Sequence, residues 1–289
     1  METRRKSRFQ KASLQRLTRI ALRCWYTEDG VKAMTELQLR GSPQTLELAR
    51  NLYTSRHWRR RGLAMYIASQ LWRREGGRLV MYATEACYPL LFAGLHDPHP
   101  AVITDAVTGF AHRYHPAALD DLVRLSTHAN DQVRWAVAFT LSGYTQPESI
   151  ATLLHLMTDR DDEVRNYATW ALGEMHEADT PEIRAALWRN VDDRDEHVHG
   201  EALDGLAQRG DTRVIPYLIA RLAPDCRAYA LNAAETLADP VLLPALLALQ
   251  AGCGEPASGE ASYWKSRLRD AIAACSPPTA ESTSSETPC

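Results

Sequence analysis

The chain has 289 residues, of which 45% are hydrophobic, and its formal net charge is −3. This composition allows a sizeable buried core. No apolar run approaches the roughly 18 residues that would span a bilayer, and no signal-peptide segment follows METRRKSRFQ, so we expect no membrane span and a cytoplasmic location.

The N-terminal part of the chain is basic. Residues 1–80 contain 18 Lys/Arg and 6 Asp/Glu, whereas the remainder contains 15 Lys/Arg and 30 Asp/Glu. The apolar stripe formed by Leu14, Leu17, Ala21 and Leu22 predicts an amphipathic helix. Because a stack of helical repeats must cover its end face, we expect residues 1–41 to form a basic helical cap.

A sequence motif recurs along the chain, as HANDQVRWAVAFTLSGY, DRDDEVRNYATWALGEM and DRDEHVHGEALDGLAQRG. Similarity at a period of this order is typical of stacked repeats, each of which is one supersecondary unit. The steps between equivalent positions are 31, 31, 34 and 28 residues when the phrases are aligned on Val102, Val133, Val164, Val198 and Cys226.

Each repeat is predicted to be a pair of helices. The first helix begins at a proline, which suits the first helical turn because its missing N–H would be unpaired there. The second helix follows an Asn or Asp that can cap the exposed amides. The prolines are Pro116, Pro147, Pro181 and Pro240, and Thr180 and Asp239 are caps just before two of them. The capping residues of the second helices are Asn130, Asp161 and Asp195.

Counted from its valine, the second helix carries apolar or small residues at positions 0, +4, +7 and +8. In the clearest copy these are Val164, Ala168, Ala171 and Leu172. At 100° per residue they gather on one face, as a helix packed against its neighbours requires. No repeat could bury such a face alone, so neighbouring repeats must complete the core.

These motifs resemble a HEAT-repeat α-solenoid of the phycobilisome-lyase-like type, which is common in bacterial proteins. The resemblance implies an all-α, right-handed α-solenoid of about six to seven helical hairpins over residues 42–275. It also implies a structural ladder in which an Arg after the valine pairs with an Asp at a repeat joint. The ladder residues are Arg134, Asp159, Arg165 and Asp193. The polar, Pro/Ser/Thr-rich residues 276–289 are expected to be a disordered tail.

Positions +2 and +6 of the second helices point away from the predicted core, position +3 lies at its edge, and together they place aromatic rings beside acids. Such residues are typical of binding hot spots, so we expect a non-catalytic scaffold for a protein or extended peptide, and the acids favour a basic one. The alternative is that the rings pack between repeats. The predicted partner-binding residues are Trp135, Phe139, Asn166, Tyr167, Trp170, Glu201, Asp204, Tyr229 and Asn232.

The basic N-terminal third supports a second hypothesis, nucleic-acid binding or DNA repair. Arg56, Arg59 and Arg60 could contact phosphates, and Trp58 could stack on a base. Arg61 instead fits the ladder position of the first repeat.

A metal enzyme is the third hypothesis. The imidazoles of one repeat and Asp97 are chemically suited to a metal, but their spacing matches no known tight site. Because the six cysteines contain no CxxC pair, a zinc knuckle is not indicated either. We assign no catalytic residue and expect no metal or cofactor. The histidines in question are His96, His99, His112 and His115.

Overall fold

The computed structural model describes residues 8–223, 226–252 and 259–277. The chain divides into two compact units, an N-terminal unit (residues 1–171) and a C-terminal unit (residues 172–289). Most of the predicted disordered tail, from residue 278 onward, lies outside the described residues. Within the described ranges, no helix is both long enough and apolar enough to cross a membrane.

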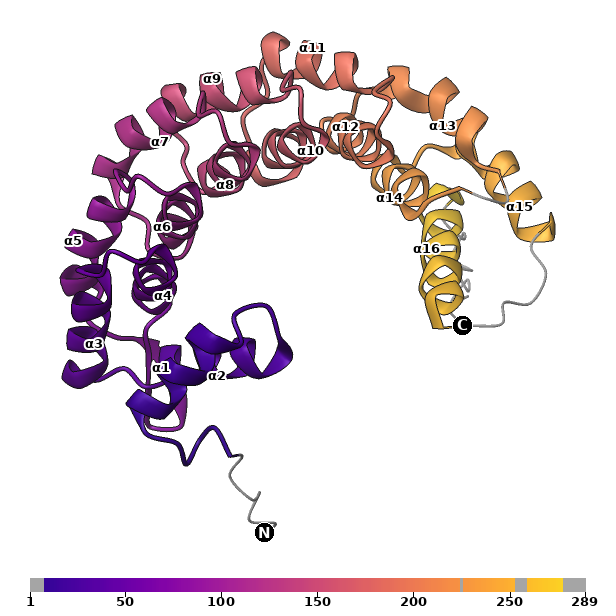
Figure 1. The fold of residues 1–289 in the computed structure, drawn as a ribbon. Coiled ribbons are helices and arrows are strands. Elements are labelled where there is room, and N and C mark those ends of the chain that lie inside the picture. Colours follow the sequence, from indigo (N-terminus) through magenta and orange to yellow (C-terminus); the bar gives the residue numbers. More distant parts are fainter. Residues whose placement is uncertain (1–7, 224–225, 253–258, 278–289) are drawn as a thin grey trace, which may run out of the picture. The chain divides into compact units, whose positions relative to one another are not determined.

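The N-terminal unit consists of a helical pair followed by four repeats. The first helices of the repeats form one layer and the second helices form the other (Figure 1). Helices α1 and α2 pack against each other and against α4. The elements are α1 (Leu14–Arg23), α2 (Glu28–Gln38), α3 (Pro43–Tyr53), α4 (Trp58–Ser69), α5 (Thr84–Gly94), α6 (Pro100–His112), the 3-10 turn η1 (Pro116–Ala118), α7 (Leu119–Leu125), α8 (Asp131–Leu141), α9 (Pro147–Leu156) and α10 (Asp162–Trp170).

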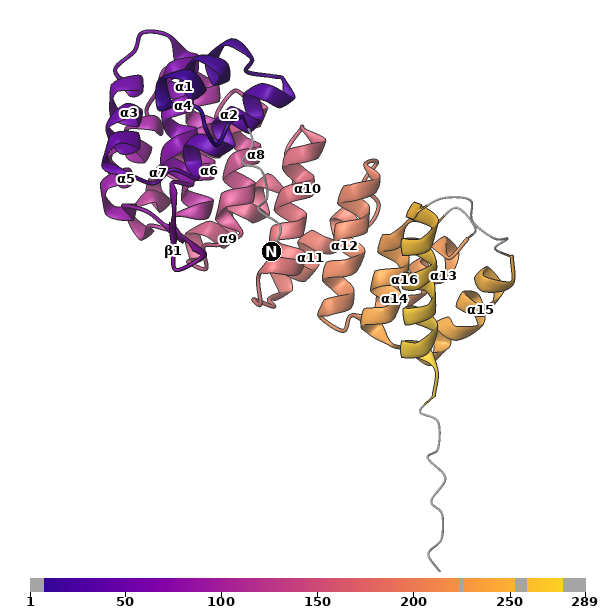
Figure 2. The same cartoon turned by 90° about the horizontal axis from the view of Figure 1, so that it is seen from below.

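The C-terminal unit contains three further helical pairs. Its second helices α12, α14 and α16 lie side by side (Figure 2). A π-helical turn, η2 (Ala171–Met175), precedes the first of these pairs. The remaining elements are α11 (Pro181–Asn190), α12 (Glu196–Gln208), the 3-10 turn η3 (Thr212–Val214), α13 (Ile215–Arg221), α14 (Ala228–Leu237), the 3-10 turn η4 (Pro240–Leu242), α15 (Leu243–Gly252) and α16 (Gly259–Cys275).

The predicted helix boundaries are confirmed at the capped ends. Asn130, Asp161 and Asp195 each precede a second helix, and each accepts hydrogen bonds from first-turn amides through the side chain. Thr180 caps α11 in the same way, with Pro181 as its first residue. These caps satisfy backbone donors that the helix itself leaves unpaired.

The alignment on Cys226 needs correction. In α6, α8, α10 and α12 the aligned valine is the third helical residue, whereas Cys226 lies before α14, whose third residue is the buried Ala230. The shift is four residues, close to one helical turn. The predicted face of α14 therefore changes little, although the position numbers do.

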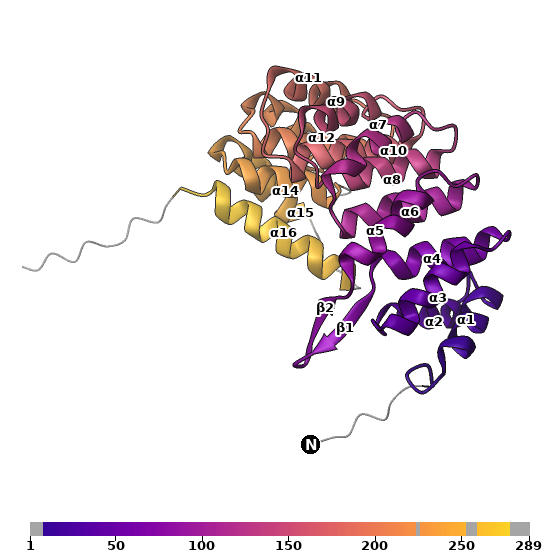
Figure 3. The same ribbon diagram turned by 90° about the vertical axis from the view of Figure 1, so that its left-hand side faces the viewer.

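A β-hairpin between α4 and α5 is a feature that the helical pattern did not predict. Strand β1 (Trp72–Glu75) pairs antiparallel with β2 (Arg78–Met81), and the pair projects from the helices of the N-terminal unit (Figure 3). Gly76 and Gly77 form the turn with φ of 55° and 85°. A two-residue turn with positive φ at both positions favours glycine and matches the twist of the strands.

Arg113 holds the base of this hairpin. The residue is 2% exposed, and its guanidinium donates hydrogen bonds to the carbonyl oxygens of Ala68, Ser69, Leu71 and Tyr82, at 2.7 to 3.2 Å. Burial lowers the pKa of Arg113. A single buried cation therefore joins the end of α4 to both ends of the hairpin.

Candidate functional site

Four of the predicted binding residues form an aromatic cluster on α8 and α10 of the N-terminal unit. Trp135 and Phe139 stack with ring centroids 5.9 Å apart. Tyr167 meets both edge-on, at 5.2 and 6.0 Å, and Trp170 lies 6.4 Å from Phe139. All four side chains are half-buried. The rings therefore pack against one another and still present surface to solvent.

Asn166 lies beside this aromatic cluster on α10. Its side chain is half-buried, and its Oδ1 atom is inaccessible to solvent and has no hydrogen-bond partner among the described residues. An unsatisfied buried carbonyl costs free energy, which the packing around α10 must offset.

The other predicted residues form an acidic cluster in the C-terminal unit. Glu201 and Asp204 lie on α12 and are 9% and 5% exposed. Burial is the main cause that raises the pKa of Asp204 to about 8, and the nearby Glu174 and Glu201 carboxylates add to it. Burial also raises the pKa of Glu201, followed by the charge of Glu174.

Neighbouring helices bring polar groups to this acidic cluster. On α14, Tyr229 lies near Glu201 and Asn232 lies near Asp204, and each favours the charged form of the acid and so partly offsets its raised pKa. Arg267 of α16 donates from Nε to Asn232 Oδ1 at 2.9 Å. The predicted residues of α12 and α14 thus meet at one place.

Two features that sequence reasoning missed shape the acidic cluster. A Cβ atom on Gly200 would lie 2.3 Å from the Tyr229 ring, so a glycine is needed for that ring to reach α12. Glu174 lies in the π-helical turn η2, beside the close approach of Gly173 to Gly205. Such turns alter the direction of side chains and are frequent at functional sites.

At two repeat joints an arginine in the ladder position forms an ion pair with an aspartate. Arg134 on α8 pairs with Asp159 through two hydrogen bonds of 2.7 and 2.8 Å, and Arg61 pairs with Asp97 at the same distances. Arg165 reaches residue 159 through its backbone carbonyl, at 2.9 Å, and also pairs with Asp162. Asp193 accepts a hydrogen bond from the amide of residue 195, at 2.9 Å.

The residues of the nucleic-acid hypothesis are dispersed. Trp58 is half-buried and stacks on His99, with ring centroids 4.3 Å apart, so that face is not free for a base. Arg56 is exposed, and Arg59 lies over the rings of Trp58 and Tyr26.

Arg60 belongs to a different feature, an outer pocket of about 550 Å³ in the N-terminal unit. Arg19 and Arg23 also line this pocket, and Leu48 and Leu52 contribute apolar surface. The three arginines give the pocket a positive rim.

The histidines of the metal hypothesis have other contacts. His99 caps α6, and His115 packs edge-on against Tyr88 at 4.5 Å. His112 hydrogen-bonds to Gln70, and His96 lies 3.3 Å from an oxygen of Asp121. Within the described residues, no three His, Cys, Asp or Glu side chains gather as they would to hold a metal ion.

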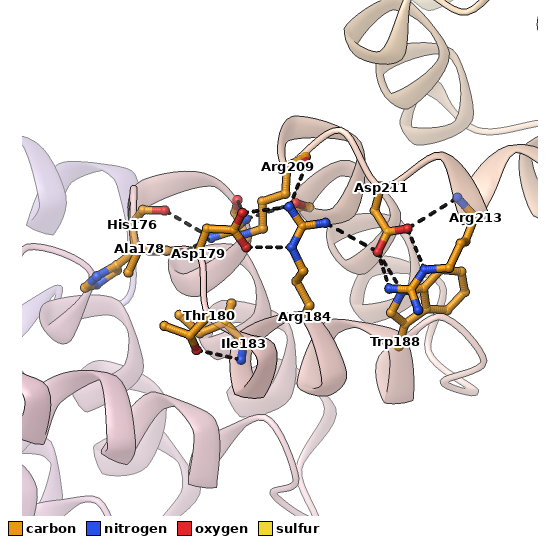
Figure 4. Close-up of polar contacts among 12 residues, drawn as sticks. His176, Ala178, Asp179, Thr180, Ile183, Arg184, Trp188, Arg209, Asp211 and Arg213 are labelled. Carbon is orange, nitrogen blue, oxygen red and sulfur yellow. Dashed lines mark hydrogen bonds and ion pairs between the residues drawn. The ribbon is translucent and has the colours of Figure 1, made fainter.

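A network of ion pairs forms a further polar cluster in the C-terminal unit (Figure 4). Arg184 pairs with Asp179, Arg213 pairs with Asp211, and Trp188 donates to Asp211 at 3.0 Å. Hydrogen bonding to Arg213 lowers the pKa of Asp211 far below its usual range.

Arg209 completes this network by donating to the carbonyl oxygens of His176 and Ala178, at 3.1 and 2.9 Å (Figure 4). Its guanidinium thereby ties the segment before α11 to the end of α12. The acids of the network are neutralised by arginines of the same chain, so its role is to hold repeats together.

Comparison with protein families and solved structures identifies the repeats. The family model for HEAT repeats matches residues 88–173 and 156–238. Protein YibA of Escherichia coli K12 is 27% identical over 219 residues, which cover 73% of this chain and 75% of YibA.

Two solved structures show the same fold. The crystal structure of YibA superposes with a TM-score of 0.71 at 22% identity and covers 93% of this chain and 99% of YibA. The crystal structure of Kap121p has a TM-score of 0.59 at 13% identity and covers 90% of this chain but 33% of that protein. The predicted all-α solenoid is confirmed. The finer phycobilisome-lyase-like assignment stays a prediction.

Proposed function

The chain belongs to the HEAT-repeat family, whose members typically serve as protein-interaction scaffolds, and we propose that it binds a partner protein through its second helices without catalysing a reaction. The aromatic cluster of Trp135, Phe139, Tyr167 and Trp170 is the observation that carries this proposal. Half-buried rings that brace one another lose little side-chain freedom on binding, which favours affinity. A cytoplasmic location is part of the same proposal.

An extended peptide is the form of partner that suits this surface. Its side chains would cover the exposed ring surfaces of the aromatic cluster. The acids on the second helices of the C-terminal unit, Glu201 and Asp204, favour a partner that carries basic residues.

The double variant Tyr167→Ala/Trp170→Ala tests the proposal. A library of random dodecapeptides is selected against the wild-type protein, and the selected peptides are then titrated against both proteins. We expect at least a tenfold loss of affinity in the variant, because two of the four rings are removed. Equal affinity for a correctly folded variant would contradict the proposal.

The matched control for this experiment is Tyr114→Ala. Tyr114 is 49% exposed in the same unit and lies outside the aromatic cluster. Its removal should leave the affinity of the selected peptides unchanged. Circular dichroism and thermal melting of each variant separate lost binding from lost folding.

Nucleic-acid binding is the second candidate function. The observation that favours it is the positive rim formed by Arg19, Arg23 and Arg60 around the outer pocket. If several phosphates bind there, the affinity for single-stranded DNA falls steeply as salt is raised. A flat salt dependence, or equal binding by the triple Arg→Ala variant, would exclude this candidate.

A further inference from the structure

Two carboxyl groups of the acidic cluster are buried and incompletely bonded. Asp204 is 5% exposed and Glu201 is 9% exposed. Asp204 Oδ1 and Glu201 Oε2 are each inaccessible to solvent and have no hydrogen-bond partner among the described residues. A buried oxygen of this kind costs free energy unless a donor reaches it. Two such atoms on neighbouring turns of α12 therefore require an explanation.

The groups around these carboxyls come from every helix that packs on this face of α12. From η2, Glu174 adds a third acid, and its exposed side chain marks the solvent side of the cluster. From α14, Tyr229 and Asn232 lie near the carboxyls and lower their pKa, and His197 of α12 hydrogen-bonds to the Tyr229 hydroxyl at 3.1 Å.

Arg267 is the cation whose charge acts on Asp204, and it already forms ion pairs with other acids. Arg267 of α16 forms ion pairs with Glu235 and Asp270 and hydrogen-bonds to Asn232. Its charge is therefore shared among other acids, and its donors do not reach the unsatisfied oxygens of Glu201 and Asp204. The cluster retains an excess of acidic groups over cations.

We propose that Glu201 and Asp204 form a subsite for one lysine or arginine side chain of a basic peptide, and that the binding of this cation releases protons to solvent. The inference rests on the proposed function, because it assigns a specific contact to the basic peptide. The ammonium or guanidinium group would approach from the side of the exposed Glu174, and the two carboxyl side chains would turn toward it, since their unpartnered oxygens are inaccessible to solvent in the free protein. The proton balance is simple, since each carboxyl group that becomes a carboxylate gives its proton to the buffer.

The electrostatics of the free protein support proton release. Burial raises the pKa of Asp204 to about 8, so this group is mainly protonated at pH 7. A cation next to a carboxyl group favours its charged form and lowers its pKa. Binding therefore converts a neutral acid into a carboxylate, and affinity should rise with pH until the free protein is itself deprotonated.

Isothermal titration calorimetry with nona-arginine tests this linkage. Titrations at pH 7 in phosphate and in Tris, at equal ionic strength, give the number of protons released from the difference in enthalpy. We expect release of about one to two protons per peptide and at least a fivefold gain in affinity between pH 7 and pH 8.5. The neutral isostere nona-citrulline should neither bind nor release protons.

The variant Glu201→Gln/Asp204→Asn should abolish proton release and weaken binding at least tenfold. Glu174→Gln provides a second test that leaves both acids of the subsite in the sequence and removes only the exposed third acid. Its charge contributes to the raised pKa of both acids, so its removal should reduce the number of protons released. Wild-type binding without proton release, or no binding of nona-arginine, would overturn the subsite.

The aromatic variant Tyr167→Ala/Trp170→Ala distinguishes failure of the subsite from failure of the proposed function. The acidic subsite predicts that this variant still releases protons when nona-arginine binds. Loss of dodecapeptide binding with retained proton release supports both inferences, whereas loss of proton release in this variant contradicts the separate acidic subsite. Spermidine is the last arm, and tighter binding of this free polyamine than of nona-arginine would show that the cation does not come from a peptide.

Discussion

The guanidinium of Arg134 forms two parallel hydrogen bonds with the carboxylate of Asp159, and it also donates to the carbonyl oxygens of His128 and Ala129. Arg61 makes the same set of contacts with Asp97 and with two carbonyl oxygens of the preceding loop. The planar fork of arginine fits this arrangement, in which a carboxylate and loop carbonyls must be satisfied together.

Replacing Arg134 by Ala should destabilise the protein by about 3 kcal/mol, because it leaves the Asp159 carboxylate at the joint without its main partner. Arg134→Lys should recover only part of the loss, since an ammonium cannot form the paired contact. Urea unfolding followed by circular dichroism measures both changes. Arg160→Ala, an exposed neighbour, is the matched control, and equal midpoints for Arg134→Ala and Arg160→Ala would contradict the structural role.

Arg113→Met should lower the free energy of unfolding by about 3 kcal/mol or more. The methionine fills the buried space but leaves the carbonyl groups of Ala68, Leu71 and Tyr82 without their donor. Amide exchange of β1 and β2 should accelerate at the same time, because the hairpin loses its anchor. Unchanged exchange in the strands would show that the hairpin is held by other contacts.

Stability should fall as pH rises through the range in which the buried Asp204 loses its proton. Its folded-state pKa is raised to about 8, whereas an unfolded Asp titrates near the ordinary value, so the folded state binds the proton more tightly. The contribution is fully present below about pH 4 and is lost as pH approaches 8. Asp204→Asn should flatten this decline and raise the melting temperature at pH 8.5.

Thermal melting of the wild type and Asp204→Asn at pH 6 and pH 8.5 measures this effect. Asp120→Asn provides the control, because Asp120 is exposed. A parallel pH dependence in wild type and Asp204→Asn would mean that another group causes the decline.

Gly200→Ala should displace the Tyr229 ring, because the new Cβ would lie 2.3 to 2.8 Å from three ring carbons. We expect a loss of about 1 to 3 kcal/mol from overpacking. Gly252→Ala is the comparison, since no atom of the part of the chain that the structure describes lies within 4 Å of a Cβ at that position. Tyr229→Ala in the Gly200→Ala background should restore part of the loss. No interaction between the two substitutions in a double-mutant cycle would contradict the contact.

The repeated helix pairs were predictable because period, proline positions and capping residues all indicate the same boundaries. The residue of α14 that is equivalent to the repeated valines was not predictable. Cys226 precedes α14, and the third residue of that helix is the buried Ala230. The face of α14 was still assigned usefully, because a shift of four residues preserves a helical face. Tyr229 accordingly does reach Glu201.

The polar contacts of the acidic cluster were less predictable. The helical periodicity of α12 predicts that Glu201 and Asp204 lie on one face. It does not predict Arg267, which comes from a helix far along the chain, or Glu174, whose position is set by a π-helical turn. The hairpin has a local sequence signal, because Gly76 and Gly77 stand between two short runs that resemble strands. Helical periodicity alone does not reveal such a signal.

The turn of that hairpin is a suitable site for attaching the protein to a surface. A Cβ atom built on Gly76 or Gly77 would meet nothing within 4 Å, and neither residue belongs to a helix pair. A short biotin-acceptor tag spliced there would immobilise the protein on a sensor chip without changing α8 or α10, the helices of the same unit that carry the aromatic cluster.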